Sequence, residues 1–433
     1  MRQFWTSVYN TFFPVFLLIV RLVSLFLPKV KATLDGRRHL FADLEAKLKQ
    51  LPQDHHPRLW IHASSVGEFE QARPVIAAYR KHAPDAFVAV TFLSVSGYEA
   101  KKNSPDTNLV CYLPVDTPAN ATRFVSMLRP DVLILMRYDF WLNHLLEARC
   151  QGATLILASA VLAPNAAYLR PVIKSFYRVI FTLFDKVFTL TEADAVRYRA
   201  SFGLKDVEVG GDPRFDQVVQ RSRNRAKVQH LQKHYEGRKV LVAGSSWKID
   251  ESMILPAFKS VQAENDSLIL VPHEIRNENI LRLEDDLNRA GFTFEKISSL
   301  SASFTADKVL IIDQIGYLAE LYSLASIAYI GGGFGVNVHN TLEAAVYGIP
   351  VIYGPNIKKS LEAKELAALG GATIVHNEND LQAILKKFFT DEKARKASGE
   401  IAGRYVAERT GATEKILEYL LALGLHHSSS LRR

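Results

Sequence analysis

Cysteine is scarce in this chain. Among 433 residues there are two, Cys111 and Cys150, and neither lies in a CxxC or CxxH pattern. This excludes the usual zinc motifs and a scaffold held by disulfides, so the sequence predicts a protein of a reducing compartment. Glycine (23) and proline (17) are too few for a collagen-like or low-complexity protein. A mean hydropathy of +0.01 excludes a protein with many membrane spans.

The composition that remains is that of a globular protein, with 48% hydrophobic and 23% charged residues. At roughly 150 residues per domain, the length predicts two or three domains. The 53 Lys and Arg residues exceed the 45 Asp and Glu residues, which gives a net charge of +8. Because this charge is dispersed, it fits a solvated surface or attraction to an anionic membrane or substrate. No basic–aromatic array accompanies it, so we expect no nucleic acid partner.

The first thirty residues differ from the rest. An apolar block runs from Phe4 to Leu27, is interrupted by Pro14 and Arg21, and is followed by basic residues between 29 and 38. Its bulky residues and the lack of an Ala-x-Ala pattern argue against a signal peptide. A spanning helix, a helix lying in the membrane interface and a helix packed on its own domain all remain open. The basic flank indicates that the following chain stays cytoplasmic.

Short apolar runs alternate with amphipathic helical stretches, which predicts parallel sheets with helices on both faces. We expect strands at Leu59–Ala63, Phe87–Phe92, Val132–Met136, Thr154–Ala158, Val187–Leu190, Val240–Ala243, Leu268–Val271, Val309–Ile312, Ile327–Ile330 and Val351–Tyr353, and helices at Glu68–Lys81, Glu251–Ser260 and Leu342–Tyr347. The predicted organisation is an anchor helix (1–30), an acceptor domain (31–216), a donor domain (217–410), and a C-terminal helix with a frayed tail (411–433). The fold class is α/β, with two doubly wound Rossmann-like domains facing a cleft.

One motif in the first half contains a candidate catalytic residue. Residues 60–68 read as a strand, a turn at Gly67 and a helix that opens with Glu68. A carboxylate at the carboxyl end of a strand can take a proton from an attacking hydroxyl. Alternatively, Glu68 only complements the helix dipole.

The second half contains three similar strand ends. Gly244-Ser-Ser can bind phosphate or serve as a plain turn. His273 follows another strand and is either a capping residue or a ligand. After the glycines 331–335, Asn340 and Glu343 predict a helix cap or a ribose contact. Neither a G-x-G-x-x-G fingerprint nor a P-loop is present.

Together these motifs resemble the 3-deoxy-D-manno-octulosonic acid (Kdo) transferases, glycosyltransferases of the two-Rossmann (GT-B) type. The resemblance extends from the N-terminal segment to about residue 410. It is carried by His62-Ala-Ser-Ser-Val-Gly-Glu68, Met136-Arg-Tyr-Asp-Phe-Trp141, Thr191-Glu-Ala-Asp194, Gly211-Asp-Pro-Arg-Phe-Asp216, Gly244-Ser-Ser, Val271-Pro-His, Asp313-Gln-Ile-Gly316, and Gly331-Gly-Gly through His339-Asn-Thr-Leu-Glu343.

The resemblance implies roles for these residues. Glu68 would be the catalytic base, and Arg214 would stabilise the leaving phosphate or the sugar carboxylate. Arg137 also falls in the catalytic set. Many members of the family have an acidic residue at this position, so the charge there is reversed in this chain. The implied contacts to the donor CMP-Kdo are Ser245, Ser246, Pro272, His273, Ile315, Gly316, Tyr317, Asn340, Thr341, Leu342 and Glu343.

The family reaction would be inverting transfer of Kdo to a lipid A precursor in lipopolysaccharide biosynthesis. It would take place on the cytoplasmic face of a bacterial inner membrane, with no metal or other cofactor. Two alternatives remain open. One is a UDP-sugar transferase or epimerase of the same fold, and the other is a membrane-associated binding protein that has lost its chemistry.

Overall fold

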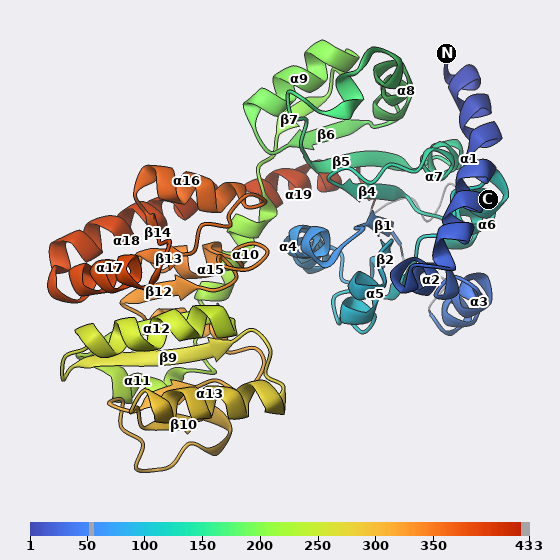
Figure 1. Cartoon of the computed structure of the whole chain (residues 1–433). Coiled ribbons are helices and arrows are strands. Elements are labelled where there is room, and N and C mark those ends of the chain that lie inside the picture. The colour runs from blue at the N-terminus through green and yellow to red at the C-terminus, as the bar shows by residue number, and fades with distance from the viewer. Residues whose placement is uncertain (52–55, 426–433) are drawn as a thin grey trace. The chain divides into compact units, whose positions relative to one another are not determined.

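The structure is a computed structural model that describes residues 1–51 and 56–425. The expected frayed tail, His426–Arg433, lies outside the described residues. The chain divides after Asp216 into two compact units, and residues from Thr410 onward return to the first unit. Within the described residues, each unit is built on one parallel sheet of seven strands (Figure 1).

The sheet of the first unit has the strand order β3-β2-β1-β4-β5-β6-β7. Its strands are β1 (Arg58–His62), β2 (Phe87–Phe92), β3 (Leu109–Tyr112), β4 (Val132–Met136), β5 (Thr154–Ala160), β6 (Lys186–Thr189) and β7 (Val207–Val209). The helices are α1 (Arg2–Ser24), α2 (Pro28–Asp35), α3 (Leu40–Gln50), α4 (Val66–His82), α5 (Val95–Lys101), α6 (Pro118–Leu128), α7 (Leu142–Cys150), η1 (Ala167–Leu169), α8 (Pro171–Phe181), α9 (Glu192–Phe202) and α19 (Ala412–Ala422). Helix α10 (Pro213–Ser222) leads from the first unit into the second.

The sheet of the second unit has the strand order β10-β11-β9-β8-β12-β13-β14. Its strands are β8 (Lys239–Ser246), β9 (Asp266–Pro272), β10 (Phe294–Lys296), β11 (Val309–Ile311), β12 (Ile327–Ile330), β13 (Val351–Tyr353) and β14 (Ala372–Ile374). The helices are α11 (Gln229–Tyr235), α12 (Lys248–Val261), α13 (Asn277–Arg289), η2 (Ile297–Ser299), α14 (Leu318–Leu321), η3 (Tyr322–Leu324), α15 (Leu342–Ala345), α16 (Leu361–Leu369), α17 (Glu378–Thr390) and α18 (Glu392–Ala407).

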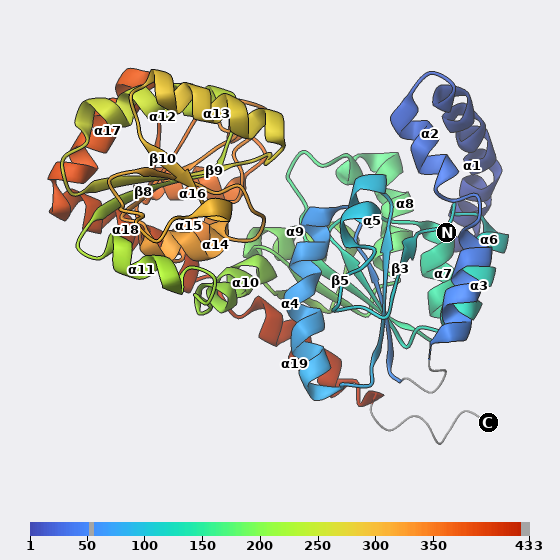
Figure 2. The same ribbon diagram turned by 90° about the horizontal axis from the view of Figure 1, so that it is seen from below.

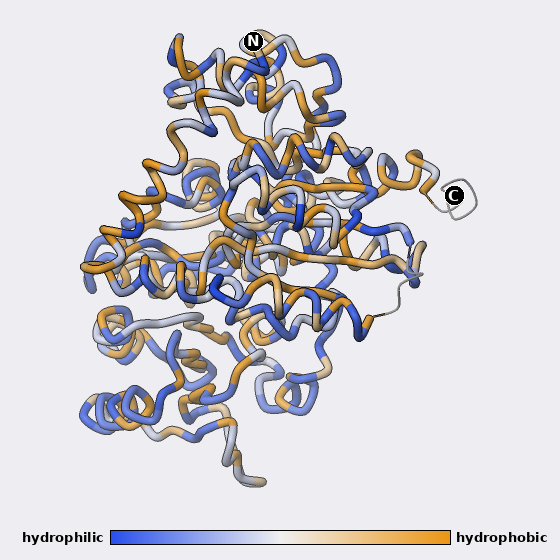
Figure 3. The backbone as a smooth tube through the Cα atoms, turned by 90° about the vertical axis from the view of Figure 1, so that its right-hand side faces the viewer, coloured by the Kyte–Doolittle hydropathy of each residue, from blue (hydrophilic) through white to orange (hydrophobic). Residues whose placement is uncertain are grey.

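Both faces of the first sheet are buried. Trp60 of β1 and Phe124 of α6 belong to the apolar core on one face. On the other face, Phe69 of α4 shares a core with Ile416 of α19, so the last helix completes the first unit (Figure 2). Hydrophobic and hydrophilic residues alternate along the surrounding helices (Figure 3), as expected for helices that bury one face against a sheet.

In each unit the chain crosses once from one side of its first strand to the other. It starts at β1, moves outward to β3, and then returns to the other side of β1 to form β4. The second unit likewise starts at β8 and later forms β12 on the other side of β8, but its path outward differs, because β11 lies between β9 and the edge strand β10. Helices on opposite faces leave a crevice at the carboxyl ends of the two strands at such a point. The motifs at residues 62–68 and 136–141 follow β1 and β4, and those at residues 244–246 and 331–343 lie at the ends of β8 and β12.

The apolar N-terminal block was expected to form one anchor helix over residues 1–30, but the structure divides it between two helices. Helix α1 ends at Ser24, and α2 begins at Pro28 after an extended Leu27. Pro28 lies in the first turn of α2, a position that proline favours, whereas Pro14 is accommodated inside α1. Within the described residues, α1 alone is long and apolar enough to cross a membrane, with a mean hydropathy of 1.6.

The glycine turn after β12 predicts a sharp difference between two alanine variants. A Cβ atom at Gly331 would lie 2.1 Å from the Ser245 carbonyl oxygen, whereas at Gly335 the nearest atom would be 3.5 Å away. We expect Gly331→Ala to lower the free energy of unfolding by about 1–3 kcal/mol, because the neighbouring turn must move. Gly335→Ala is the matched control and should change it little. Urea unfolding of both variants measures this, and equal stabilities would contradict the packing described here.

Candidate functional site

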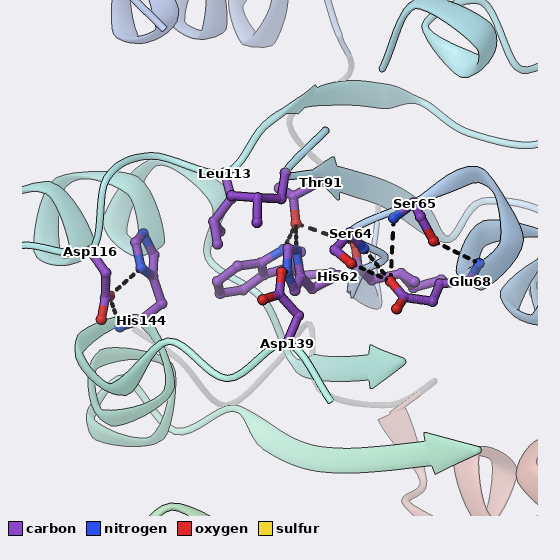
Figure 4. Close-up of polar contacts among 12 residues, drawn as sticks. His62, Ser64, Ser65, Glu68, Thr91, Leu113, Asp116, Asp139 and His144 are labelled. Atoms are coloured by element: carbon purple, nitrogen blue, oxygen red, sulfur yellow. Dashed lines mark hydrogen bonds and ion pairs between the residues drawn. The ribbon is translucent and has the colours of Figure 1, made fainter. Parts of the chain in front are cut away.

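Glu68 lies in the first turn of α4, at the strand reversal of the first unit. Ser65 caps the helix, with its hydroxyl 3.4 Å from the Glu68 backbone nitrogen. The Glu68 side chain returns the contact, because its Oε2 accepts from the backbone nitrogens of Ser64 and Ser65 and from the Ser64 hydroxyl (Figure 4). This is a capping box. Oε1 has no hydrogen-bond partner among the described residues, so one carboxylate oxygen is held while the other is available.

A histidine–carboxylate pair lies beside this turn. His62, the last residue of β1, contacts Asp139 through Nε2 at 2.9 Å and the Thr91 hydroxyl through Nδ1 at 2.9 Å (Figure 4). The indole of Trp60 donates to that same Thr91 oxygen at 2.9 Å. When the Thr91 hydroxyl donates to Nδ1 of His62, the imidazole donates to Asp139 through Nε2. His62 is 2% exposed, so this pair orients a partly exposed carboxylate from a rigid strand end.

Two arginines flank a second network in the same unit. Arg137 has a left-handed backbone (φ 64°) and donates through Nε to the Gln71 side-chain oxygen at 2.7 Å. Arg214 binds Asp212 through Nε and a terminal nitrogen, at 2.9 and 2.8 Å. Burial alone would raise the pKa of Asp212, but Arg214 and the Gln71 side chain hold that pKa below its usual value. Each arginine is thus held by one polar side chain, Arg137 by Gln71 and Arg214 by Asp212.

The reversal of the second unit is organised by one buried acid. Asp250, in the first turn of α12, accepts from the Tyr329 hydroxyl at 2.7 Å and from the backbone nitrogens of Trp247 and Gly332 at 2.9 and 3.1 Å. Burial raises its pKa despite these bonds. Asp250 therefore fixes the glycine turn relative to the end of β8.

Three rings stack at this same place. Trp247 follows β8, His273 follows β9, and His339 closes the glycine turn. The ring centroids lie 4.5 Å apart for Trp247 and His273, and 4.2 Å apart for His273 and His339. The Trp247 indole donates to His339 Nε2 at 2.9 Å, so that nitrogen carries no proton. Burial, and then the nearby His273, lower the pKa of His339 to about 4.

A cavity of about 390 Å³ lies in the second unit. Gly316 and Glu343, from two of the predicted donor-binding segments, both line it. Arg221 lies 3.6 Å from the Glu343 carboxylate, and Lys227 donates to the Gly316 carbonyl oxygen at 3.1 Å. The cavity therefore combines an acidic side chain with two basic ones. Its other lining residues are Asn224, Leu318, Ala319 and Glu320.

The remaining predicted residues occupy different environments. Ser245 has a left-handed backbone (φ 52°), while Ser246 is 2% exposed and donates its hydroxyl to Glu251. Pro272, Thr341 and Leu342 are buried, whereas Ile315 is 85% exposed. Tyr317 stands beside the Lys227 ammonium. The expected helix Leu342–Tyr347 is shorter, because α15 ends at Ala345, and its cap is Thr341, with Asn340 accepting from the Leu342 nitrogen.

The sequence reading gave no role to several residues that organise these sites. Gln71 binds Arg137, Asp212 binds Arg214, and Arg221 and Lys227 supply the basic side of the cavity. The signal for Asp212 was its place in the motif of residues 211–216. No local pattern distinguishes Gln71 from other polar residues on a helix.

Comparison with known proteins gives one consistent result. The family model described as 3-deoxy-D-manno-octulosonic-acid transferase (kdotransferase) matches residues 38–217. The 3-deoxy-D-manno-octulosonic acid transferase of Aquifex aeolicus is 30% identical over 374 residues, covering 84% of this chain and 94% of that protein. The protein of the same name from Haemophilus influenzae is 23% identical over 427 residues, covering 97% and 98%.

Solved structures share the fold. A UDP-GlcNAc 2-epimerase from Neisseria meningitidis, bound to UDP-GlcNAc, is 18% identical, with a TM-score of 0.57 over 84% of this chain and 100% of that one. A glycosyltransferase from Rickettsia africae is 13% identical, with a TM-score of 0.52 over 85% and 98%. At these identities the likeness establishes the α/β GT-B fold alone.

The ring stack predicts acid sensitivity in the second unit. The folded pKa of His339, about 4, lies below its ordinary value of 6.5, so the folded chain binds fewer protons than the unfolded chain between these values. The stabilisation is complete above pH 6.5 and is lost as the pH falls towards 4. We expect His339→Gln to flatten the decline of the melting temperature over this range.

The control is His376→Gln, at an exposed histidine of the same unit. Thermal unfolding at a series of pH values compares the two variants with the parent protein. An unchanged pH profile in His339→Gln would show that this ring does not couple protonation to folding.

Proposed function

This chain belongs to the 3-deoxy-D-manno-octulosonic acid (Kdo) transferase family, and on that premise we propose that it moves Kdo from CMP-Kdo to a lipid A precursor with inversion. Membership makes the protein a Kdo glycosyltransferase of lipopolysaccharide biosynthesis. The observation that supports the proposed chemistry is Glu68, whose Oε2 is held by three donors while its Oε1 has none among the described residues.

In the proposed reaction Glu68 takes the proton of an acceptor hydroxyl at Oε1. The acceptor oxygen forms a bond to the anomeric carbon of Kdo as the bond from that carbon to the phosphate oxygen breaks. CMP leaves with the bonding electrons, and the configuration inverts because attack and departure occur on opposite faces. A well-placed general base contributes about 10²–10⁴-fold to such a step.

The arginines fit a reaction in which every reactant is anionic. Kdo carries a carboxylate, and the donor and the lipid A precursor carry phosphate. We assign Arg214 and Arg137 to the stabilisation of these anions. The Asp212 pair fixes the direction of the Arg214 guanidinium, and Gln71 does the same for Arg137. A left-handed backbone at a non-glycine residue is costly and is commonly found at functional sites, which supports the choice of Arg137.

The second unit suits the nucleotide. Its cavity of about 390 Å³ lies within the range of roughly 300–1,000 Å³ that is typical of small-ligand pockets. Glu343 can accept from ribose hydroxyls, and Arg221 and Lys227 can balance a phosphate. His273 lies between Trp247 and His339 in the ring stack, and burial lowers its pKa, which favours the neutral ring. We therefore propose that the phosphate is bound by the basic residues of the cavity and not by this strand end.

A conservative substitution tests the base. Glu68→Gln keeps a side chain that is accepted in a capping box but removes the basic oxygen. We expect transfer from CMP-Kdo to a tetra-acylated lipid A precursor to fall by about 10²–10⁴-fold, with an unchanged melting temperature. Glu70→Gln, on the same helix and ion-paired with Lys101, is the control. Mass spectrometry of the product measures transfer, and near-normal activity of Glu68→Gln would refute the assignment.

We also propose that the enzyme lies on one side of the membrane and does not cross it. The Tyr9 hydroxyl in α1 donates to Asp116 at 2.8 Å, and Asn143 donates to Asn10 at 2.9 Å, so the first half of α1 is fixed to the first unit. After α2, Arg37 donates to two backbone carbonyl oxygens of the same unit. A segment that leaves a domain and returns to it has both ends on one side of the bilayer.

The second half of α1 and the turn that follows it are apolar and exposed. Leu18, Leu22, Leu25 and Phe26 have exposed fractions of 57, 54, 74 and 82%. The stretch from residue 14 to residue 27 is shorter than the about 20 residues needed to span a bilayer. It suits insertion into one leaflet, on the cytoplasmic face of the inner membrane, with the basic residues that follow on anionic headgroups.

Cysteine labelling distinguishes the two topologies. Ser7 of α1 and the exposed Cys150 line the same pocket, so an interfacial helix keeps both on one side. In sealed inner-membrane vesicles, an impermeant maleimide should label Ser7→Cys in a Cys150→Ser background from the same side as Cys150 in the parent. The buried Cys111 should stay unlabelled in both. Labelling of the two positions from opposite sides would mean that α1 spans the membrane.

A further inference from the structure

An apolar groove runs along one face of α1 in the first unit. Its volume is about 440 Å³. Six of its lining residues recur on α1 at intervals of three and four, which places them on one side of the helix, and two come from the body of the unit. They are Trp5, Val8, Tyr9, Phe12, Phe13, Phe16, Trp141 and Phe176. The lining is thus almost entirely aromatic or aliphatic.

One polar atom in this wall is unsatisfied. The indole N–H of Trp141 is buried and has no hydrogen-bond partner among the described residues. An unpaired buried donor costs about 1–3 kcal/mol. Within the described residues no acceptor relieves it, so an incoming ligand with a carbonyl oxygen would gain a bond that the free protein lacks.

The groove begins at the loop that carries the first-unit site. Trp141 is separated from Asp139 by one residue, and Asp139 is held by His62 at the end of β1. Tyr9 lies near the same acid: burial and Asp116 raise the pKa of the Tyr9 hydroxyl, and Asp139 adds to the effect. In the other direction the groove passes Phe12 and Phe16, which are 65 and 51% exposed, towards the free apolar part of α1.

We propose that this groove binds one acyl chain of the lipid acceptor. The chain packs against the apolar face of α1 and against Phe176. The carbonyl of its ester or amide link accepts from Trp141 as the chain separates the helix from the loop. The proposal rests on the proposed function, because it is the acceptor that must bring both a sugar hydroxyl and an acyl chain to this loop. A bulk phospholipid contacts the membrane-facing side of α1 and lacks the sugar hydroxyl that brings the acceptor to the Asp139 loop.

Fluorescence quenching tests occupancy without catalysis. The chain has four tryptophans, of which Trp5 and Trp141 line the groove, Trp60 is 1% exposed, and Trp247 lies in the second unit. A monoacyl lipid brominated along its chain, used below its micelle concentration, should quench the parent protein. The double variant Trp5→Phe/Trp141→Phe should lose most of this quenching. Quenching that persists in the double variant would overturn the proposal.

Two matched substitutions on α1 locate the site. Val8→Phe adds bulk inside the groove, and Val15→Phe adds the same bulk at a 54% exposed position that does not line it. We expect Val8→Phe to need at least about tenfold more lipid for the same quenching, which corresponds to the loss of roughly two buried methylene groups. Val15→Phe should leave the quenching unchanged. Equal behaviour of the two variants would place the lipid elsewhere.

Competition identifies the source of the chain. The acylated acceptor should displace the brominated lipid, and its fully deacylated disaccharide should not. A phospholipid of equal chain length that displaces it as well as the acceptor does would contradict the proposal, because the groove would then only bind bilayer lipid.

Kinetics connects the groove to transfer. Val8→Phe should raise KM for the acylated acceptor about tenfold, with kcat unchanged, and should not alter transfer to the deacylated disaccharide. If the parent protein transferred Kdo to neither acceptor, the proposed function would fail. The quenching and competition results would then decide separately whether the groove takes this acyl chain.

Discussion

The geometry of both sites follows from the reversal of strand order in a parallel sheet. Parallel strands place all their carboxyl ends at one edge, and a reversal moves successive helices to opposite faces, which opens a crevice between the two strands concerned. In the first unit this lies between β1 and β4, and Glu68 and Asp139 follow their ends. In the second unit it lies between β8 and β12, where Trp247 and His339 meet. One constraint of the chain path thus produces two similar positions for polar groups.

The two crevices stabilise their polar groups in opposite ways. The first holds charges, since Asp212 is paired with Arg214 and its pKa is lowered despite burial. In the second, burial raises the pKa of Asp250 and lowers that of His339, so both shifts favour the uncharged form. Fixed arginines suit anionic reactants whose charge shifts during transfer, whereas a neutral stack gives a rigid frame for the glycine turn. The basic residues of the second unit lie apart from this stack, in the cavity lined by Arg221 and Lys227.

The ten strands expected from the sequence are all present, because buried parallel strands are continuous apolar runs. The strands that were missed are β3, β7, β10 and β14. Three of them, β7, β10 and β14, are only partly buried and therefore do not form continuous apolar runs, whereas β3 is a fully buried run that was not predicted from the sequence. The turn at Gly67 and the helix start at Glu68 could be predicted from the sequence, because strand, turn and cap are local patterns. The bond between Arg137 and Gln71 and the three-ring stack could not be predicted, because each joins residues from separate crossovers and depends on the packed sheet.

The N-terminal helix acts as part of the first unit and not as a flexible tether. Asp116 is fully buried and accepts from the Tyr9 hydroxyl as well as from the His144 backbone and imidazole. A buried carboxylate is tolerated only when its partners are in place, so the Tyr9 bond restrains α1 at a fixed point on the domain. On the proposal that the exposed part of α1 inserts into the membrane, this restraint would set the depth and orientation of the Asp139 loop relative to the bilayer. For a membrane-bound acceptor, it would then limit which sugar hydroxyl reaches the proposed base, Glu68, a selection that no single side chain in the site could make.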